Sequence, residues 1–157
     1  MKITNIVKAL YDGFECAVVD KEATSELFKI TTGVKQGCAM SGFLFLLITD
    51  WIMRHTVKDE GTGLKWNFRS KLEDIDFADD VALISSTQRH VQLKTNRLVT
   101  NAARAGLRVN VDKCKVVRTN ARNIMELSLT VNGQVLGDVE KFIYQGATVC
   151  KQRGVSY

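Results

Sequence analysis

Apolar residues recur at helical spacing in three segments of this chain. The first covers residues 4–11, the second residues 38–58 and the third residues 87–105. The length of the second segment favours a helix over a strand. Thr87 is a suitable N-cap for the third segment and Gly106 a suitable C-terminal glycine. The pattern therefore predicts one short helix and two long ones.

Short stretches rich in β-forming residues predict two hairpins. Residues 15–19 and 26–31 read as strands joined by a polar connection over residues 20–25. Residues 72–77 and 81–85 read as a second pair, and the Ala-Asp-Asp sequence between them predicts the turn. Further β-like pieces fill residues 107–149, with turn signals at Asn110, Asn120, Asn132-Gly133 and Gly137-Asp138.

This order of elements predicts an α+β domain. We expect a three- to four-stranded antiparallel sheet with the two long helices packed on one face. The 157 residues, 45% of them hydrophobic and 25% charged, fit one globular domain or a piece of one. The excess of 22 basic over 17 acidic residues is compatible with a polyanionic partner but does not by itself identify one.

Several other classes of protein are disfavoured. The four cysteines (Cys16, Cys38, Cys114 and Cys150) have no C-x-x-C spacing, so we expect reduced thiols rather than a zinc site or a disulfide framework. The most apolar run, residues 43–53, is too short for a membrane span, which needs about 20 residues. With no secretory signal at its start, the chain is predicted to be intracellular, in either the nucleus or the cytoplasm.

The predicted turn at residues 78–80 carries the strongest chemical signal. Asp79 and Asp80 lie there, with Asp74 and Asp76 in the preceding strand. Such a group of carboxylates is costly unless cations compensate it. Mg²⁺ prefers one or two carboxylates together with substrate phosphates, and a pair of such ions catalyses phosphoryl transfer. Taken alone, an Asp-Asp pair is more often an ordinary solvated turn.

Four motifs in one order resemble reverse transcriptases of non-LTR retrotransposons. Residues 77–80 read F-A-D-D, similar to the [FY]-x-D-D box of that family. Residues 33–41 resemble G-V-x-Q-G-x-x-x-S, residues 106–113 match G-L-x-x-N-x-x-K, and residues 142–146 resemble the F-x-Y-L-G primer grip. The resemblance covers most of the chain and implies a partial polymerase palm over residues 1–157, which adds deoxynucleotides to a DNA primer on an RNA template.

The family resemblance also implies roles for individual residues. Asp79 and Asp80 would hold Mg²⁺, with Mn²⁺ as a possible substitute, and Ala78 would let the primer end approach. Lys113 would donate a proton to departing pyrophosphate; a plain surface lysine is the alternative. The nucleotide and template base would lie on the loop formed by Gly33, Gln36, Gly37 and Ser41, and the primer would be held by Phe142, Tyr144 and Gly146. Turn chemistry at the two loop glycines and a sheet face at the aromatic pair are the simpler readings.

A groove for the template–primer backbone is a further expectation, although ordinary solubilising charge is the simpler explanation of each basic residue taken alone. The residues concerned are Lys29, Lys35, Arg104, Arg108, Lys113, Lys115 and Arg118.

The chain also departs from the family pattern. The family's first catalytic aspartate, in an A-F-D motif, would precede residues 4–11, and the fingers and thumb are not represented either. Ala39 and Gly42 stand where the family usually has prolines, and Gln145 replaces a leucine. These differences predict a fragment that is inactive alone. A non-catalytic nucleic-acid-binding remnant and a structural α+β domain are the alternatives, and the oligomeric state is not predicted.

Overall fold

The computed structural model describes residues 2–21, 23–31, 33–58, 61–119 and 128–151, and the backbone of residues 154–156. The chain divides into two compact units, Met1–Gly42 and Phe43–Tyr157, and each is described by itself.

The first unit contains the predicted short helix and the first predicted hairpin. Helix α1 covers Lys2–Tyr11, where the helical spacing placed it. The hairpin forms two short antiparallel ladders rather than one. Between them Ser25 N donates to Val18 O at 2.9 Å, but Val18 N donates to the Ser25 side-chain oxygen at 2.9 Å rather than to a backbone carbonyl. Its ladders pair β1 (Glu15–Cys16) with β4 (Phe28–Lys29) and β2 (Val19–Asp20) with β3 (Ala23–Thr24).

Both long helices are confirmed. Helix α2 covers Ala39–Thr56 and runs from the first unit into the second. Helix α3 covers Gln88–Arg104, and the Thr87 side chain accepts a hydrogen bond from His90 N at 3.3 Å, as an N-cap should. The chain then turns through Gly106, whose φ of +78° favours glycine.

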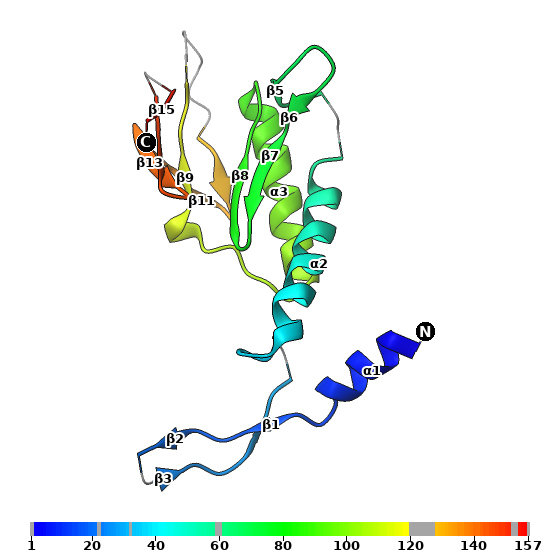
Figure 1. Ribbon diagram of the computed structural model, residues 1–157. Helices are drawn as coiled ribbons and strands as arrows, with labels where there is room; N and C mark the ends of the chain where they lie inside the picture. The colour runs from blue at the N-terminus through cyan, green and yellow to red at the C-terminus, as the bar shows by residue number, and fades with distance from the viewer. Residues whose placement is uncertain are drawn as a thin grey trace. The chain divides into compact units, whose positions relative to one another are not determined.

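The second unit holds the second predicted hairpin and several small sheets (Figure 1). Six two-stranded sheets and one three-stranded sheet form within the described residues of the whole chain. The predicted mixture of helices and strands is confirmed. The described strands form several small sheets, one of them three-stranded and antiparallel, instead of the single sheet that was expected. The remaining elements are β5 (Leu64–Lys65), β6 (Lys71–Leu72), β7 (Asp74–Phe77), β8 (Asp80–Leu83), the 3-10 helix η1 (Val111–Lys113), β9 (Lys115–Val116), β10 (Thr130–Val131), β11 (Gln134–Val135), β12 (Gly137–Asp138), β13 (Lys141–Tyr144), β14 (Ala147–Cys150) and β15 (Gly154–Ser156).

One predicted turn is a strand. Gly137 and Asp138 form β12, which pairs with β9. This pairing is parallel, whereas an antiparallel sheet was expected. The Asp138 carboxylate lies 2.8 Å from the guanidinium of Arg118, two residues after β9. Gly-Asp favours turns locally, but the pairing with a distant segment overrides that preference. Asn132-Gly133 is the expected turn, while Asn120 lies outside the described residues.

The small core of the second unit lies between α2, α3 and the strands. Helix α3 contacts β8 and β10, and the Gln92 side chain binds both backbone groups of Thr130 at 2.8 Å. Thr56, at the end of α2, is fully buried and accepts a hydrogen bond from Asn101 on α3 at 3.5 Å. The buried apolar residues are Ile52, Met53, Ala102, Val116, Leu129 and Val131.

Candidate active site

The predicted aspartate turn is the two-residue connection of the β7–β8 hairpin. Its antiparallel register pairs Phe77 with Asp80, which leaves Ala78 and Asp79 as the turn. The expected reversal is confirmed, with one correction: Asp80 begins β8 instead of lying in the turn. Because side chains alternate along a strand, Asp80 shares a face with Phe77, and Asp76 lies on the other face with Val81.

The backbone at Ala78 is strained. Its φ is +54°, in the left-handed region that non-glycine residues rarely adopt, whereas Asp79 has no positive φ. A positive φ at the first central residue alone is the type II′ arrangement, which matches the twist of the flanking strands. The fold therefore holds a tight turn here without the glycine that such turns usually contain.

The carboxylates of Asp79 in the turn and of Asp80 just after it are open to solvent, since both residues are exposed. Among the described residues, no group of three or more His, Cys, Asp or Glu side chains is placed to hold a metal ion. Two adjacent exposed carboxylates nevertheless fit Mg²⁺, which takes one or two protein carboxylates and completes its shell with substrate phosphates and water.

The predicted primer-grip hairpin touches this turn. The Tyr144 hydroxyl, at the end of β13, donates to Ile75 O at 3.2 Å and Asp80 O at 3.3 Å. The neighbouring Gln145 Nε2 lies 3.5 Å from Asp80 Oδ2. Burial raises the pKa of Tyr144, and the negative charges of Asp80 and Asp76 raise it further. Two segments that are far apart in the sequence therefore meet at the aspartates.

The turn between β13 and β14 differs from the aspartate turn. Gln145 and Gly146 both have positive φ, +50° and +79°, which is the type I′ arrangement of a two-residue hairpin. Phe142 and Tyr144 alternate with exposed positions and are half-buried. The two aromatic residues thus lie on the same face of the strand, as their spacing of two residues predicted. Their contact with primer stays a prediction.

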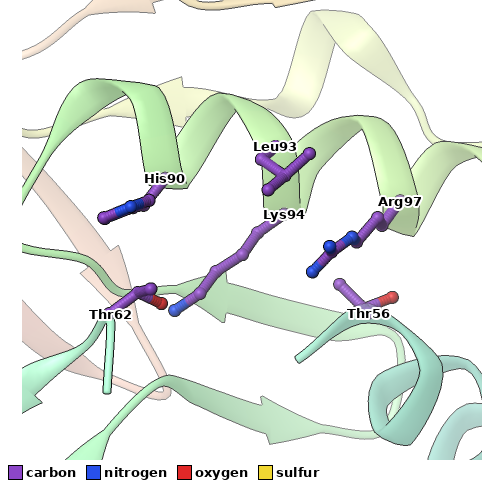
Figure 2. A pocket seen from close by; sticks show the side chains of 6 residues that line it. All are labelled: Thr56, Thr62, His90, Leu93, Lys94 and Arg97. Atoms are coloured by element: carbon purple, nitrogen blue, oxygen red, sulfur yellow. The ribbon is translucent and has the colours of Figure 1, made fainter. Parts of the chain in front are cut away.

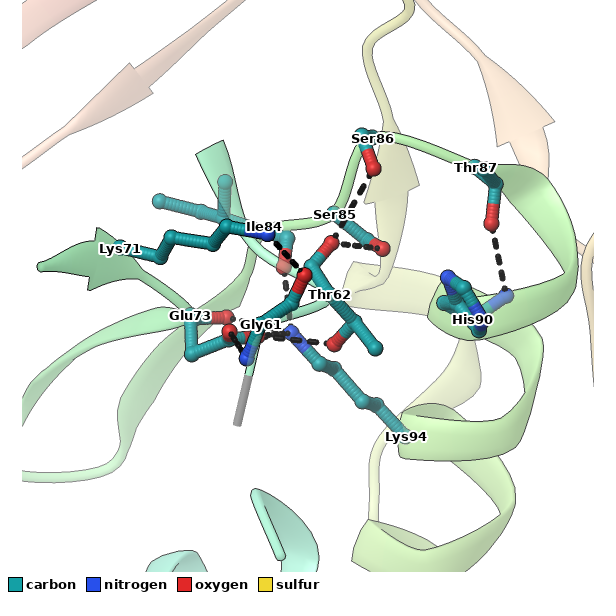
Figure 3. A network of polar contacts seen from close by, with 10 residues as sticks. All are labelled: Gly61, Thr62, Lys71, Glu73, Ile84, Ser85, Ser86, Thr87, His90 and Lys94. Carbon is teal, nitrogen blue, oxygen red and sulfur yellow. Dashed lines mark hydrogen bonds and ion pairs between the residues drawn. The ribbon is translucent and has the colours of Figure 1, made fainter. Parts of the chain in front are cut away.

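At its open end, the β7–β8 hairpin is fastened to α3 by a buried lysine (Figure 3). The Lys94 ammonium donates to Glu73 O at 3.1 Å, Glu73 Oε2 at 2.5 Å and Ile84 O at 2.6 Å. Its side chain is 4% exposed and that of Glu73 11%. Glu73 and Ile84 flank the hairpin, and Ile84 N donates to Glu73 O at 2.8 Å, so the lysine binds the pair of residues just beyond the ladder.

The Glu73 carboxylate is held by several donors besides Lys94. Gly61 N donates to Oε1 at 2.9 Å and the Thr62 hydroxyl to Oε2 at 2.8 Å. Burial alone raises the pKa of Glu73, but Lys94, the Gly63 backbone, Thr62 and Gly61 outweigh burial and lower the pKa to about 2. The site is therefore an ion pair in which both charges have hydrogen-bond partners.

Asp74, next in β7, shows the opposite electrostatic effect. Burial raises its pKa, and the charges of Asp76 and Glu73 add to this increase, while Lys94 opposes it. The sequence predicted a group of negative charges on this hairpin, and that group is present in β7. The buried ammonium of Lys94 compensates only part of this charge.

A small cavity adjoins this ion pair but is not a substrate site. Its lining side chains come from α3, from the end of α2 and from Thr62 (Figure 2). Its volume of about 10 Å³ holds roughly one water molecule. Chemistry on a nucleotide therefore has no place there, and the exposed turn at the other end of the hairpin is the better candidate. The lining residues are Thr56, Thr62, His90, Leu93, Lys94 and Arg97.

A second group of predicted residues lies in the first unit, around the loop at residues 33–37. Gly33 and Gly37 both have positive φ, +89° and +77°, so the loop needs its glycines. The buried Ser41 hydroxyl donates to Lys35 O at 2.6 Å and lies 3.3 Å from the Tyr11 hydroxyl. Ser41 thus closes the loop onto the first turn of α2, while Gln36 is exposed.

The Lys35 ammonium lies over two aromatic rings of the same unit. Its Nζ is 3.8 Å from the centroid of the Phe14 ring and 5.5 Å from that of Tyr11. Such cation–π contacts fix the lysine near the loop. The contact of this loop with nucleotide and template stays a prediction.

Lys113 lies exposed at the end of η1, whose N-cap is Asn110; Asn110 Oδ1 accepts from Asp112 N at 3.2 Å. The segment that resembles the G-L-x-x-N-x-x-K motif is therefore a capped turn in the structure. The proton transfer proposed for Lys113 stays a prediction, and so does the groove of basic residues. Sequence reasoning missed Lys94 and Glu73, because a lysine on an amphipathic helix gives no sign that it is buried.

The chain belongs to the reverse transcriptase (RNA-dependent DNA polymerase) family, whose family model matches residues 1–154. It is similar to the Retrovirus-related Pol polyprotein from type-1 retrotransposable element R2 of Popillia japonica, with 28% identity over 91% of this chain and 25% of that protein. It is also similar to the Retrovirus-related Pol polyprotein from type-2 retrotransposable element R2DM of Drosophila melanogaster, with 29% identity over 71% of this chain and 10% of that protein. The chain thus spans a quarter or less of these two relatives.

No helix of the described residues is both long enough and apolar enough to cross a membrane.

Proposed function

We propose that this chain forms part of the palm of an RNA-directed DNA polymerase, which adds deoxynucleotides to a primer by two-metal phosphoryl transfer. The observation that carries the proposal is the β7–β8 hairpin, in which Asp79 lies in the two-residue turn, Asp80 begins the next strand, and both are exposed. The match to the reverse transcriptase family supplies the substrate class: an RNA template, a DNA primer and deoxynucleotides.

In this proposal Asp79 and Asp80 hold Mg²⁺ or Mn²⁺. When bound, these ions activate the attacking primer hydroxyl and stabilise the departing pyrophosphate oxygen. The carboxylates need a fixed position, because misplacement of about 1 Å costs about 100-fold in rate. Tyr144 holds the backbone of the hairpin near its turn, and Lys94 holds its open end. The hairpin that carries the aspartates is therefore held by contacts at both of its ends.

The test is primer extension by the purified chain on an RNA template with Mg²⁺. The departures from the family pattern predict that the chain alone extends no primer. Incorporation that is lost in Asp79→Asn and kept in Asp20→Asn, a matched control in which another exposed aspartate lies at a hairpin end, would support the metal site and refute the predicted inactivity. Incorporation that survives Asp79→Asn would refute the assignment of the metal site.

Metal binding gives a second measurement that does not depend on turnover. Mn²⁺ bound by the unaltered chain, measured by its electron paramagnetic resonance signal, should be reduced in Asp79→Asn and Asp80→Asn but not in Asp20→Asn. If the chain binds a template–primer duplex yet extends no primer and holds no Mn²⁺ at the turn, the non-catalytic alternative replaces this proposal.

A further inference from the structure

The tip of the β5–β6 hairpin presents two aromatic rings to solvent. Phe68 is 98% exposed and Trp66 is 71% exposed. The tip has a defined shape, because Asn67 Oδ1 accepts hydrogen bonds from Arg69 N at 2.9 Å and Ser70 N at 2.7 Å. Trp66 N also donates to Ser70 O at 3.1 Å. These rings are therefore displayed on an ordered loop and do not contribute to the core.

Positive charge surrounds the rings. Residues 61–72 contain Lys65, Arg69 and Lys71 and no acidic residue. The Lys65 ammonium lies 5.6 Å from the centroid of the Phe68 ring, and the Lys71 ammonium donates to Gly61 O. One cation flanks the pair of rings on each side, Lys65 before Trp66 and Arg69 after Phe68, so the loop offers stacking faces for bases beside cations for phosphates.

We propose that this tip binds an unpaired nucleic-acid strand, with bases stacked on Trp66 and Phe68 and phosphates paired with Lys65 and Arg69. Exposed rings favour an unpaired strand because the bases of a duplex already stack on one another. Stacking is tolerant of sequence, since every base has a π-face. The cations add affinity that decreases with salt. The biological setting, a template being copied, rests on the proposed function, but the binding itself is tested separately.

The tip lies away from the aspartates. Figure 1 shows the β5–β6 loop at the end of the β7–β8 hairpin opposite to the Ala78–Asp79 turn. Residues 70–78 connect the loop to the turn, and at ~3.3 Å per residue they span at most about 25 Å. At ~3.4 Å per nucleotide, that distance corresponds to about seven nucleotides. The tip would thus hold a strand several nucleotides from the site of addition.

Trp66 itself provides the readout. In the full chain carrying Trp51→Phe, Trp66 is the remaining tryptophan, because the chain has two. Titration with an oligouridylate of about 12 nucleotides, within the usual size of single-strand sites, should quench its fluorescence. Trp66→Leu with Phe68→Leu keeps an apolar side chain at both positions but removes stacking, and it should weaken binding of a fluorescein-labelled oligouridylate about tenfold or more. Trp66→Tyr with Phe68→Tyr should restore most of the affinity.

The charges are tested by salt dependence. Lys65→Gln with Arg69→Gln should reduce the slope of log affinity against log salt by about 1.4, at ~0.7 per lost phosphate contact. Lys151→Gln, a single exposed cation outside the tip, is the control and should leave the affinity unchanged. An unchanged slope in the tip variant would overturn the assignment of the phosphate contacts.

Three results would overturn the proposal: unchanged binding in the leucine variant, no quenching by the oligouridylate, or quenching only by vesicles of anionic phospholipid. Primer extension separates this inference from the proposed function. Oligouridylate binding without any extension leaves the tip assignment standing, and Mn²⁺ binding at Asp79 and Asp80 then decides the proposed function. Extension that occurs without binding at the tip refutes the tip assignment alone.

Discussion

Replacement of Lys94 by methionine tests the most consequential contact in the second unit. Methionine has a similar length but no charge, so the change removes all three hydrogen bonds that the ammonium donates to Glu73 and Ile84. The Glu73 carboxylate, 11% exposed, would keep donors from Gly61 and Thr62 but lose its counter-charge. The variant thus leaves a buried negative charge without a partner of opposite sign.

The expected loss of unfolding free energy is large. Removing one partner of a buried ion pair typically costs about 3–5 kcal/mol. A domain of this size has a stability of about 5–15 kcal/mol, so the loss is a substantial share. The exposed pair Arg54–Asp50 provides a matched control, because its side chains are 76% and 55% exposed and lie one helical turn apart. Arg54→Met should cost only about 0.3–0.5 kcal/mol.

The assay is urea denaturation followed by circular dichroism near neutral pH. The double variant Lys94→Met with Glu73→Gln should lose less than the sum of the single losses, because it removes both charges together. The reasoning is refuted if Lys94→Met stays within about 1 kcal/mol of the unaltered chain, or if it costs no more than Arg54→Met.

The same ion pair predicts a loss of stability in acid. The pKa of Glu73 is lowered from 4.5 to about 2 in the folded chain. A lowered pKa contributes stability that is complete above pH 4.5 and is lost as the pH falls toward 2. A shift of this size corresponds to about 3 kcal/mol. Glu73→Gln should therefore flatten the acid limb of the stability profile, and an unchanged limb in that variant would contradict the assignment.

Three further predictions concern other parts of the chain. Ala78→Gly should raise the unfolding free energy by up to about 1 kcal/mol, since glycine adopts a φ of +54° without strain; a loss in urea denaturation would contradict this. Tyr144→Phe should lower it by about 0.5–1.5 kcal/mol, because the hydroxyl bonds to Ile75 and Asp80 disappear; an unchanged midpoint would show that they contribute nothing. Iodoacetamide should modify Cys38 faster than Cys114, as followed by peptide mass spectrometry, because hydrogen bonds from the Met40 backbone and Ser41 lower the pKa of Cys38, whereas burial raises that of Cys114. Equal rates would contradict the last prediction.

The sequence by itself determined the local elements. The three helices lie where apolar spacing placed them, and Thr87 caps α3 as its residue type predicts. The aspartate hairpin was also predictable, because β-like runs on both sides leave only a short turn between them. The family was predictable too, since four motifs in one order are each local in sequence. These features depend on neighbours within a few residues.

Only the tertiary structure decided which distant segments meet. The placement of Tyr144 against Asp80, 64 residues away, and the parallel pairing of β12 with β9 have no local signal. The burial of Lys94 is the clearest case, because its residue type favours solvent, and only the carboxylate and carbonyls gathered by the fold make its burial tolerable. Pairing and burial depend on partners that approach through space, and the spacing of residues along the chain does not specify those partners.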